Sequence, residues 1–344
     1  MSELGSRLKY AIVRAHGLKT HLVPEETLKS WAFVTDDAAL FSEIAKTEYG
    51  PFFGGPEDLR RADKIEEAHV RVMGRRARQL IAMLSGGVAE FFRTLLVKYD
   101  LENVRRLIYA LTTGSEIPPK AALLPIDGFL LDIKTLAKAN TVEQLISLTR
   151  VEKVREVLRE WYGAEERSLV SLDLMLDAAY RDMVIQKAGE SRALSRDRAF
   201  LEVLQTYLDR ALLASALKTV IKSEVGLLKL FEGRLDPAAY RAVSTARSLR
   251  EALESLARIE RYRIPATEIL KSYEEVGQPW ILELALSRDA AVWARRYGSR
   301  KPLSPTYLLA YLVNVEWESI RVKTLLLARI AGLSGERAYD LVKG

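Results

Sequence analysis

Histidine is the commonest metal ligand and general base, and this chain has only three: His16, His21 and His69. His16 and His21 are five residues apart, which is off the i, i+4 spacing that places two metal ligands on one helix face. No acidic pattern completes a metal site around them, so we interpret all three as structural and partly exposed. The chain has no cysteine, which excludes disulfides, thiolate metal sites and cysteine nucleophiles. We therefore expect no bound metal.

Glycine-rich segments do not match a phosphate-binding loop. The G-x-x-x-x-G-K-S/T and G-x-G-x-x-G patterns are both absent from the sequence. Residues 50–55 (GPFFGG) bracket two phenylalanines and lack a following lysine, so we interpret them as a turn. Adjacent carboxylates such as Glu66 and Glu67 point about 100° apart on a helix and form no catalytic dyad. The sequence thus predicts neither a catalytic residue nor a cofactor, and a protein that is not an enzyme.

Polar residues interrupt two strongly apolar helical patterns, and they are our candidate interface residues. The first set lies in residues 99–106 and the second in residues 311–323: Asp100, Glu102, Asn103 and Arg105, then Glu316, Glu318 and Arg321. Acid before base at helical spacing fits intrahelical ion pairs on solvated faces. The alternative is a buried network between helical repeats, in which every charge needs a partner. Both interpretations stay open in the sequence; we expect these residues to hold adjacent repeats in register.

Helix patterns dominate the chain, and strand patterns are nearly absent. Apolar residues recur at helical spacing in seven segments: 70–84, 88–111, 154–161, 169–183, 201–221, 280–297 and 306–331. We predict that residues 88–111 form one long helix that ends near Gly114. The breaks between the patterns are short and rich in glycine or proline. The sequence therefore predicts an all-α fold of long antiparallel helices.

A helical unit recurs along the chain, with breaks at Pro24, Asp132, Asp236 and Ser334. At each break an apolar residue is followed by a helix-starting residue, as a helix N-terminus requires. The spacing predicts three related helical lobes around an approximate threefold axis, with repeats at 1–98, 99–206 and 207–344. Chance is the alternative, because Leu-Asp and Leu-Ser pairs are common.

The chain is basic, with 52 Lys and Arg against 46 Asp and Glu and a net charge of +6. Such a balance is typical of proteins that bind nucleic acid or anionic lipid. We favour cations spread over solvated helix faces. The densest cluster, Arg71, Arg75, Arg76 and Arg78, lies in one segment with apolar residues interleaved at helical spacing. No apolar stretch approaches 18 residues, so we expect no transmembrane segment. A basic helical scaffold or nucleic-acid-binding protein is the alternative function.

Several segments together resemble a known family. One is a Tyr-Asp-x-x-Asn-hydrophobic-basic helix at Tyr99, Asp100, Asn103 and Arg105. Another is a closing helix with Glu316 and Glu318 before Ile320-Arg321, followed by a stop at Gly332-Leu333. The opening Tyr10-Ala11-x-x-Arg14-Ala15 also fits. In these segments, and over nearly its whole length, the chain resembles the C subunit of archaeal-type (A/V-type) rotary ATPases, the relative of the d subunit of V-type ATPases.

The resemblance implies a non-catalytic central-stalk (rotor) subunit with a funnel-like, pseudo-threefold helical body. Proteins of this kind couple the membrane proteolipid ring to the central shaft subunit for proton- or sodium-linked ATP synthesis or hydrolysis. We therefore expect a monomer within a hetero-complex, peripheral to the cytoplasmic face of the cell membrane. Nucleic acid is not an expected partner.

Overall fold

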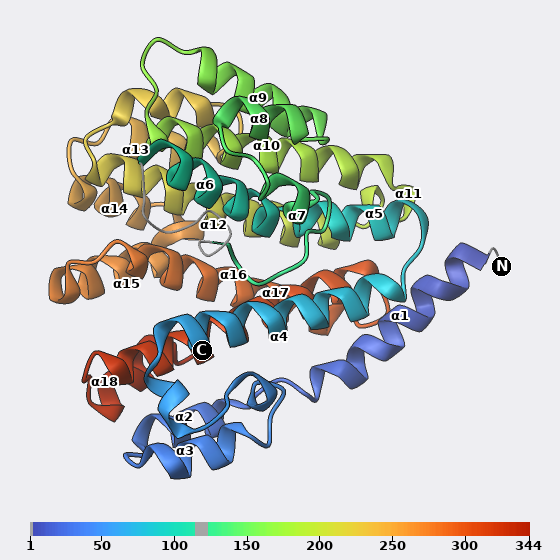
Figure 1. Ribbon diagram of the computed structural model, residues 1–344, viewed down its shortest axis with the longest axis vertical. Helices are drawn as coiled ribbons and strands as arrows, with labels where there is room; N and C mark the ends of the chain where they lie inside the picture. Colours follow the sequence, from blue (N-terminus) through green and yellow to red (C-terminus); the bar gives the residue numbers. More distant parts are fainter. Residues whose placement is uncertain (1–2, 114–122) are drawn as a thin grey trace. The chain divides into compact units, whose positions relative to one another are not determined.

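The computed structural model describes residues 3–113 and 123–344 (Figure 1). Every regular element in these residues is a helix, so the predicted all-α class is confirmed. The described residues divide into two compact units, each with its own apolar core. Unit 1 comprises residues 3–89, 124–126 and 291–344, and unit 2 comprises residues 90–113, 123 and 127–290. The three sequence repeats and their threefold arrangement stay a prediction.

Unit 1 is built around one long helix, α17. Its helices are α1 (Glu3–Lys19), α2 (Glu25–Phe33), α3 (Asp37–Ile44), α4 (Ala62–Ala82), α17 (Pro305–Ile330) and α18 (Gly335–Val342), with 3-10 turns η1 (Gly50–Phe52) and η2 (Pro56–Arg60). Leu308 and Leu309 are about 100° apart around α17, yet both are fully buried. Helix α17 is therefore covered on several sides, and α1, α4 and α18 all pack against it.

Unit 2 is a larger set of helices with a second core. Its helices are α6 (Val97–Thr113), α7 (Ile133–Leu136), α8 (Val142–Leu148), α9 (Glu152–Gly163), α10 (Leu169–Glu190), α11 (Arg192–Ser195), α12 (Arg198–Ile221), η4 (Val225–Phe231), α13 (Pro237–Ser244), α14 (Leu249–Ala257) and α15 (Glu260–Val276). Helices α5 (Gly86–Leu95) and α16 (Trp280–Arg300) contribute residues to both units. Leu217, Phe231 and Tyr262 are fully buried in the core of unit 2.

Most of the predicted helices are present, but the single helix over residues 88–111 is wrong. Helix α5 ends at Leu95 and α6 begins at Val97. The Leu96 N–H instead donates to the Arg93 carbonyl three residues back. Leu96 is fully buried and belongs to the apolar pattern. No glycine or proline lies near it, so the sequence does not mark the break. The predicted end near Gly114 lies outside the described residues.

The predicted helix starts are confirmed at three of the four break points. Asp132, Asp236 and Ser334 are the N-cap residues of α7, α13 and α18. Each side-chain oxygen accepts a backbone N–H from the first turn of its helix, which satisfies a donor that has no partner within the helix. Pro24 is the N-cap of α2 but makes no side-chain cap bond.

Candidate functional site

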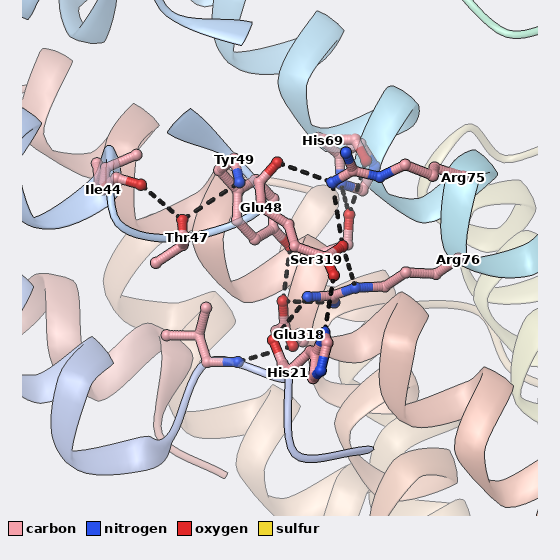
Figure 2. A network of polar contacts seen from close by, with 11 residues as sticks. His21, Ile44, Thr47, Glu48, Tyr49, His69, Arg75, Arg76, Glu318 and Ser319 are labelled. Carbon is pink, nitrogen blue, oxygen red and sulfur yellow. Dashed lines mark hydrogen bonds and ion pairs between the residues drawn. The ribbon is translucent and has the colours of Figure 1, made fainter. Parts of the chain in front are cut away.

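A buried ion pair lies between α4 and α17 in unit 1 (Figure 2). The Arg76 side chain is 2% exposed and the Glu318 side chain is 5% exposed. Arg76 Nη1 donates to Glu318 Oε1 at 2.8 Å, and the Tyr49 hydroxyl donates to the same oxygen at 2.9 Å. The backbone N–H of Val23 donates to Glu318 Oε2 at 2.9 Å. Both carboxylate oxygens are thus satisfied inside the protein, as a buried charge requires.

Arg76 spreads its guanidinium over three acceptors. Besides Glu318, its Nε donates to Glu48 Oε2 at 3.1 Å and its Nη2 to the His21 carbonyl at 2.9 Å. Arg75 donates to the Glu48 carboxylate and carbonyl at 3.1 and 3.0 Å. Two arginines therefore face two glutamates. We call the side chains of Glu48, Tyr49, Arg75, Arg76 and Glu318 the Glu318 network.

The charges of the Glu318 network shift one another's proton affinity. Burial raises the pKa of Glu318, although Arg76 acts in the opposite direction. Burial and the neighbouring Glu318 hold the pKa of Tyr49 well above its usual range, so Tyr49 stays a hydrogen-bond donor. Burial alone would raise the pKa of Glu48, but Arg76 and the other nearby donors lower it. Shifted pKa values can mark a catalytic site. Here, however, the shifted groups form hydrogen bonds to one another, which favours a structural role.

The three histidines do not form a common site. His69 is buried, not partly exposed as predicted, because the Ser319 hydroxyl on α17 packs against it and donates to its carbonyl at 3.0 Å. His16 and His21 are exposed, as predicted. Within residues 3–113 and 123–344, no group of three or more His, Cys, Asp or Glu side chains could hold a metal ion.

Arg321 ties α17 to α2 and α18. Its Nη2 pairs with Glu25 at the start of α2, and its Nε donates to the Val342 carbonyl at the end of α18 at 2.5 Å. The Tyr339 hydroxyl of α18 donates to the same Glu25 carboxylate at 2.8 Å. Arg321 and Glu318 therefore bind other helices instead of each other, which favours the buried-network interpretation on α17.

Asp100 on α6 organises the chain that leads into α7. Its carboxylate accepts the backbone N–H groups of Phe129, Leu130 and Leu131 at 2.7 to 2.9 Å. Asp100 is fully buried, so these charge-assisted bonds replace the water that it gives up on folding. The loop is close-packed, since a Cβ at Gly128 would collide with the Leu131 carbonyl oxygen.

Arg105 connects α6 with α10. It pairs with Asp173 at 3.1 Å and with Asp177, one turn further along α10. The Tyr109 hydroxyl donates to Asp173 at 2.6 Å, and the Ser215 hydroxyl of α12 donates to Asp177 at 2.6 Å. Burial raises the pKa of Asp173 despite the adjacent Arg105. These contacts form a second polar network, within unit 2.

The remaining candidates divide between the two interpretations. Glu102 pairs with Arg106 on its own helix at 3.0 Å, so these two residues form an intrahelical ion pair, as the sequence spacing suggested. Asn103 and Glu316 are both buried. The role of the seven candidates in keeping adjacent repeats in register stays a prediction.

Sequence reasoning missed several members of the networks. We expected the arginines and lysines in general to lie on solvated helix faces, but Arg76 lies on the buried side of α4. The spacing carries the signal: Arg76 is four residues after buried Val72 and four before buried Leu80. Asp173 and Asp177 likewise lie one turn apart in an apolar helix, a pattern that predicts an interior partner cation.

Comparison with known proteins identifies the family. The model of the ATP synthase (C/AC39) subunit family matches residues 11–341, so the chain belongs to this family. The predicted resemblance is therefore confirmed. The family also confirms that the chain is an accessory subunit and not itself the catalyst.

The relatives of known class have low sequence identity to this chain, but they match it over most of its length. The C subunit of the A-type ATP synthase from Pyrococcus abyssi is 22% identical over 290 residues, covering 83% of this chain and 73% of the relative. The C subunit of the A-type ATP synthase from Haloquadratum walsbyi is 22% identical over 368 residues, 98% of each chain. The one from Halorubrum lacusprofundi is 23% identical over 354 residues, 98% of this chain and 97% of the relative.

The length and apolar character of the helices decide whether any of them could cross a membrane. In the described part of the chain, none combines the length and apolar character that crossing a bilayer demands.

Proposed function

We propose that this chain is the central-stalk protein that couples the membrane proteolipid ring to the central shaft of an A/V-type rotary ATPase. It would carry torque between the two without taking part in catalysis, in proton- or sodium-linked ATP synthesis or hydrolysis. Support comes from the family and from relatives that are named as C subunits of A-type ATP synthases. The proposed body is a three-lobed funnel, present as a monomer in the hetero-complex and peripheral to the cytoplasmic face of the membrane.

The observation that carries this role is the fixing of helices by buried charge. Arg76 and Glu318 are 242 residues apart in the sequence and meet at 2.8 Å in unit 1. In unit 2, Arg105 joins α6 to α10. A part that transmits torque must resist deformation, and close-packed helices have low compressibility. Satisfied buried polar groups, such as both carboxylate oxygens of Glu318, add rigidity because each bond holds its partners in one geometry.

Co-purification from membranes tests the proposal. The tagged full-length chain would be expressed in its native host and isolated from detergent-solubilised membranes, and the bound proteins identified by mass spectrometry. We expect shaft and proteolipid subunits in stoichiometric amounts. An untagged chain in the same host controls for adhesion to the resin. Recovery of peripheral-stalk subunits in place of ring and shaft subunits would contradict the rotor role.

A further inference from the structure

Two segments of unit 1 carry many cations and no acid. Neither residues 6–24 nor residues 291–315 contain Asp or Glu. Their cations are Arg7, Lys9, Arg14, Lys19, Arg295, Arg296, Arg300 and Lys301. Residues 68–89 and 319–335 also lack Asp and Glu. Their arginines include Arg75 and Arg76, which pair with Glu48, and Arg321, which pairs with Glu25. Residues 6–24 and 291–315 together supply eight cations to unit 1.

The two segments lie side by side. His16 near the end of α1 donates from Nε2 to the Pro302 carbonyl at 2.9 Å. The His16 ring also stacks on Tyr307 of α17, with ring centroids 3.8 Å apart. Helix α1 packs along α17, so its last turns adjoin the loop that joins α16 to α17.

The outer face of α1 is apolar at its centre. Ala11, Ile12 and Ala15 are buried against the unit, whereas Tyr10 is 57% exposed and Val13 is 63% exposed. At 100° per residue, Tyr10 and Val13 point about 140° and 160° away from Ala15. The helix therefore presents two apolar side chains directly away from its own core.

Cations flank these apolar residues on both sides. Lys9 is four residues before Val13 and Arg14 is four residues after Tyr10, so each cation lies next to one of them on the helix surface. Across the His16 contact, Leu303 is 77% exposed and follows closely after Lys301. We call the exposed side chains of Lys9, Tyr10, Val13, Arg14, Arg300, Lys301 and Leu303 the α1 surface.

We propose that the α1 surface binds the headgroup region of an anionic lipid bilayer. Lys and Arg attract anionic headgroups, while Tyr, Val and Leu enter the boundary between headgroups and acyl chains. Tyr is favoured at that boundary because its ring is apolar and its hydroxyl stays hydrated. A nucleic acid backbone would pair with the cations but would leave Val13 and Leu303 in water. A folded acidic partner would need a pocket shaped for Leu303, whereas a bilayer accommodates it without one.

This inference goes beyond the proposed function, because it requires neither a ring nor a shaft. It is tested on the purified full-length chain with protein-free vesicles. One vesicle type is pure phosphatidylcholine, and the other has equal parts of phosphatidylcholine and phosphatidylglycerol. We expect co-sedimentation with the anionic vesicles and little with the neutral ones. Absence of binding to both would overturn the proposal, even if ring and shaft proteins are recovered with the chain.

Two sets of variants separate charge from apolar insertion. Each cation near an anionic surface strengthens binding roughly fivefold, so Arg14→Gln, Arg300→Gln and Lys301→Gln together should weaken it on the order of 100-fold. Tyr10→Ser with Leu303→Ser leaves the charge unchanged and should also weaken binding, on the order of tenfold or more, because apolar area is lost. Unchanged binding in the second set would contradict insertion.

A matched control removes three cations elsewhere. Lys134, Lys153 and Arg196 are exposed residues of unit 2, and their replacement by Gln gives the same net charge as the first set. We expect it to bind vesicles like the original chain. If the control variant lost as much vesicle binding as the first set, net charge alone would account for the binding. If duplex DNA bound more tightly than the vesicles in competition, the α1 surface would be a nucleic-acid site. Either result would overturn the proposal.

Discussion

Several buried or partly buried ionic side chains of this protein meet partners from other helices. Arg76 contacts Glu318 from α17, and Arg105 contacts Asp173 from α10. Removing a charge from water costs several kcal/mol, which only a partner with good geometry offsets. The helices can therefore pack in few other ways, because any slip along an axis would separate the charges.

The Arg76–Glu318 pair predicts a large loss when one partner is removed. Glu318→Ala should lower the free energy of unfolding by about 3–5 kcal/mol, since Arg76 then stays buried without its main counter-charge. Replacing both, as Arg76→Met with Glu318→Leu, should recover much of that loss. Urea denaturation followed by circular dichroism measures both.

The matched control is the exposed pair of Lys46 and Glu43 on the surface of unit 1. Lys46→Ala should cost about 1 kcal/mol or less. If Glu318→Ala costs no more than Lys46→Ala, the network does not stabilise the fold as inferred.

Another buried carboxylate, Asp209 on α12, has a less complete set of partners. Gln205 donates to its Oδ1 at 2.8 Å, and Arg261 Nη1 lies 3.7 Å from its Oδ2. Burial raises the pKa of Asp209 from 3.8 to about 6, because Arg261 and Arg181 only partly compensate. Between these two values the folded chain binds more protons than the unfolded chain does.

Stability should therefore fall as pH rises from about 4 to about 6, and this contribution should then level off. The Asp209→Asn variant lacks this titrating group. Its free energy of unfolding, relative to that of the original chain, should therefore rise by about 1–3 kcal/mol from pH 4 to pH 7. Urea unfolding at stepped pH measures the difference. A constant difference for Asp209→Asn would instead place its folded pKa near the ordinary value.

At the scale of helices, the start of α18 approaches the end of α2 very closely. A Cβ at Gly335 would lie 2.5 Å from the Ala32 carbonyl oxygen and 3.0 Å from Phe33 Cδ1. Gly335→Ala should therefore destabilise the protein by about 1–3 kcal/mol, because backbone must move. Gly189 near the end of α10 has open space around it, so Gly189→Ala should stabilise by up to about 1 kcal/mol. Thermal melts that show the same sign for both would refute this packing.

Helices were predictable wherever a stripe of apolar residues ended at a proline, glycine or capping residue. This holds for α9, α12 and α17, and for the caps at Asp132 and Asp236. The break at Leu96 was not predictable, because tertiary packing overrides a pattern that locally favours helix through it. Similarly, η2 begins at Pro56 in a segment too short for a periodic pattern.

The candidate site was half predictable. Glu318 and Asp100 were conspicuous as acids within apolar helices, and both are buried. Their partners were not, because the contact between Arg76 and Glu318 spans 242 residues and depends on how α4 packs on α17. Asp100 accepts backbone N–H groups of residues 129–131, and no side-chain pattern in the sequence reveals such donors.

At the scale of the whole molecule, the proposed function and the proposed lipid contact would both place this chain beside a membrane. The net charge is +6, and the α1 surface includes four cations, Lys9, Arg14, Arg300 and Lys301. The proposed rotor protein would bind a ring and a shaft, and it would therefore need two kinds of contact. At a contact with polar ring loops, electrostatic matching would set the register and the association rate. At a contact with a shaft, the buried core of the interface would be enriched in aromatic residues and Arg.

The two contacts should therefore respond differently to salt. If the chain is the proposed rotor protein, raising salt in the membrane pull-down should release proteolipid subunits before shaft subunits. Exposed charge pairs are screened beyond about 3 Å at 1 M salt, while a buried apolar interface is not. Quantitative mass spectrometry of each salt step measures the order. The Arg14, Arg300 and Lys301 variant should keep the same order in lipid-free detergent, because the α1 surface is assigned to lipid. Simultaneous release of ring and shaft would contradict two chemically distinct contacts.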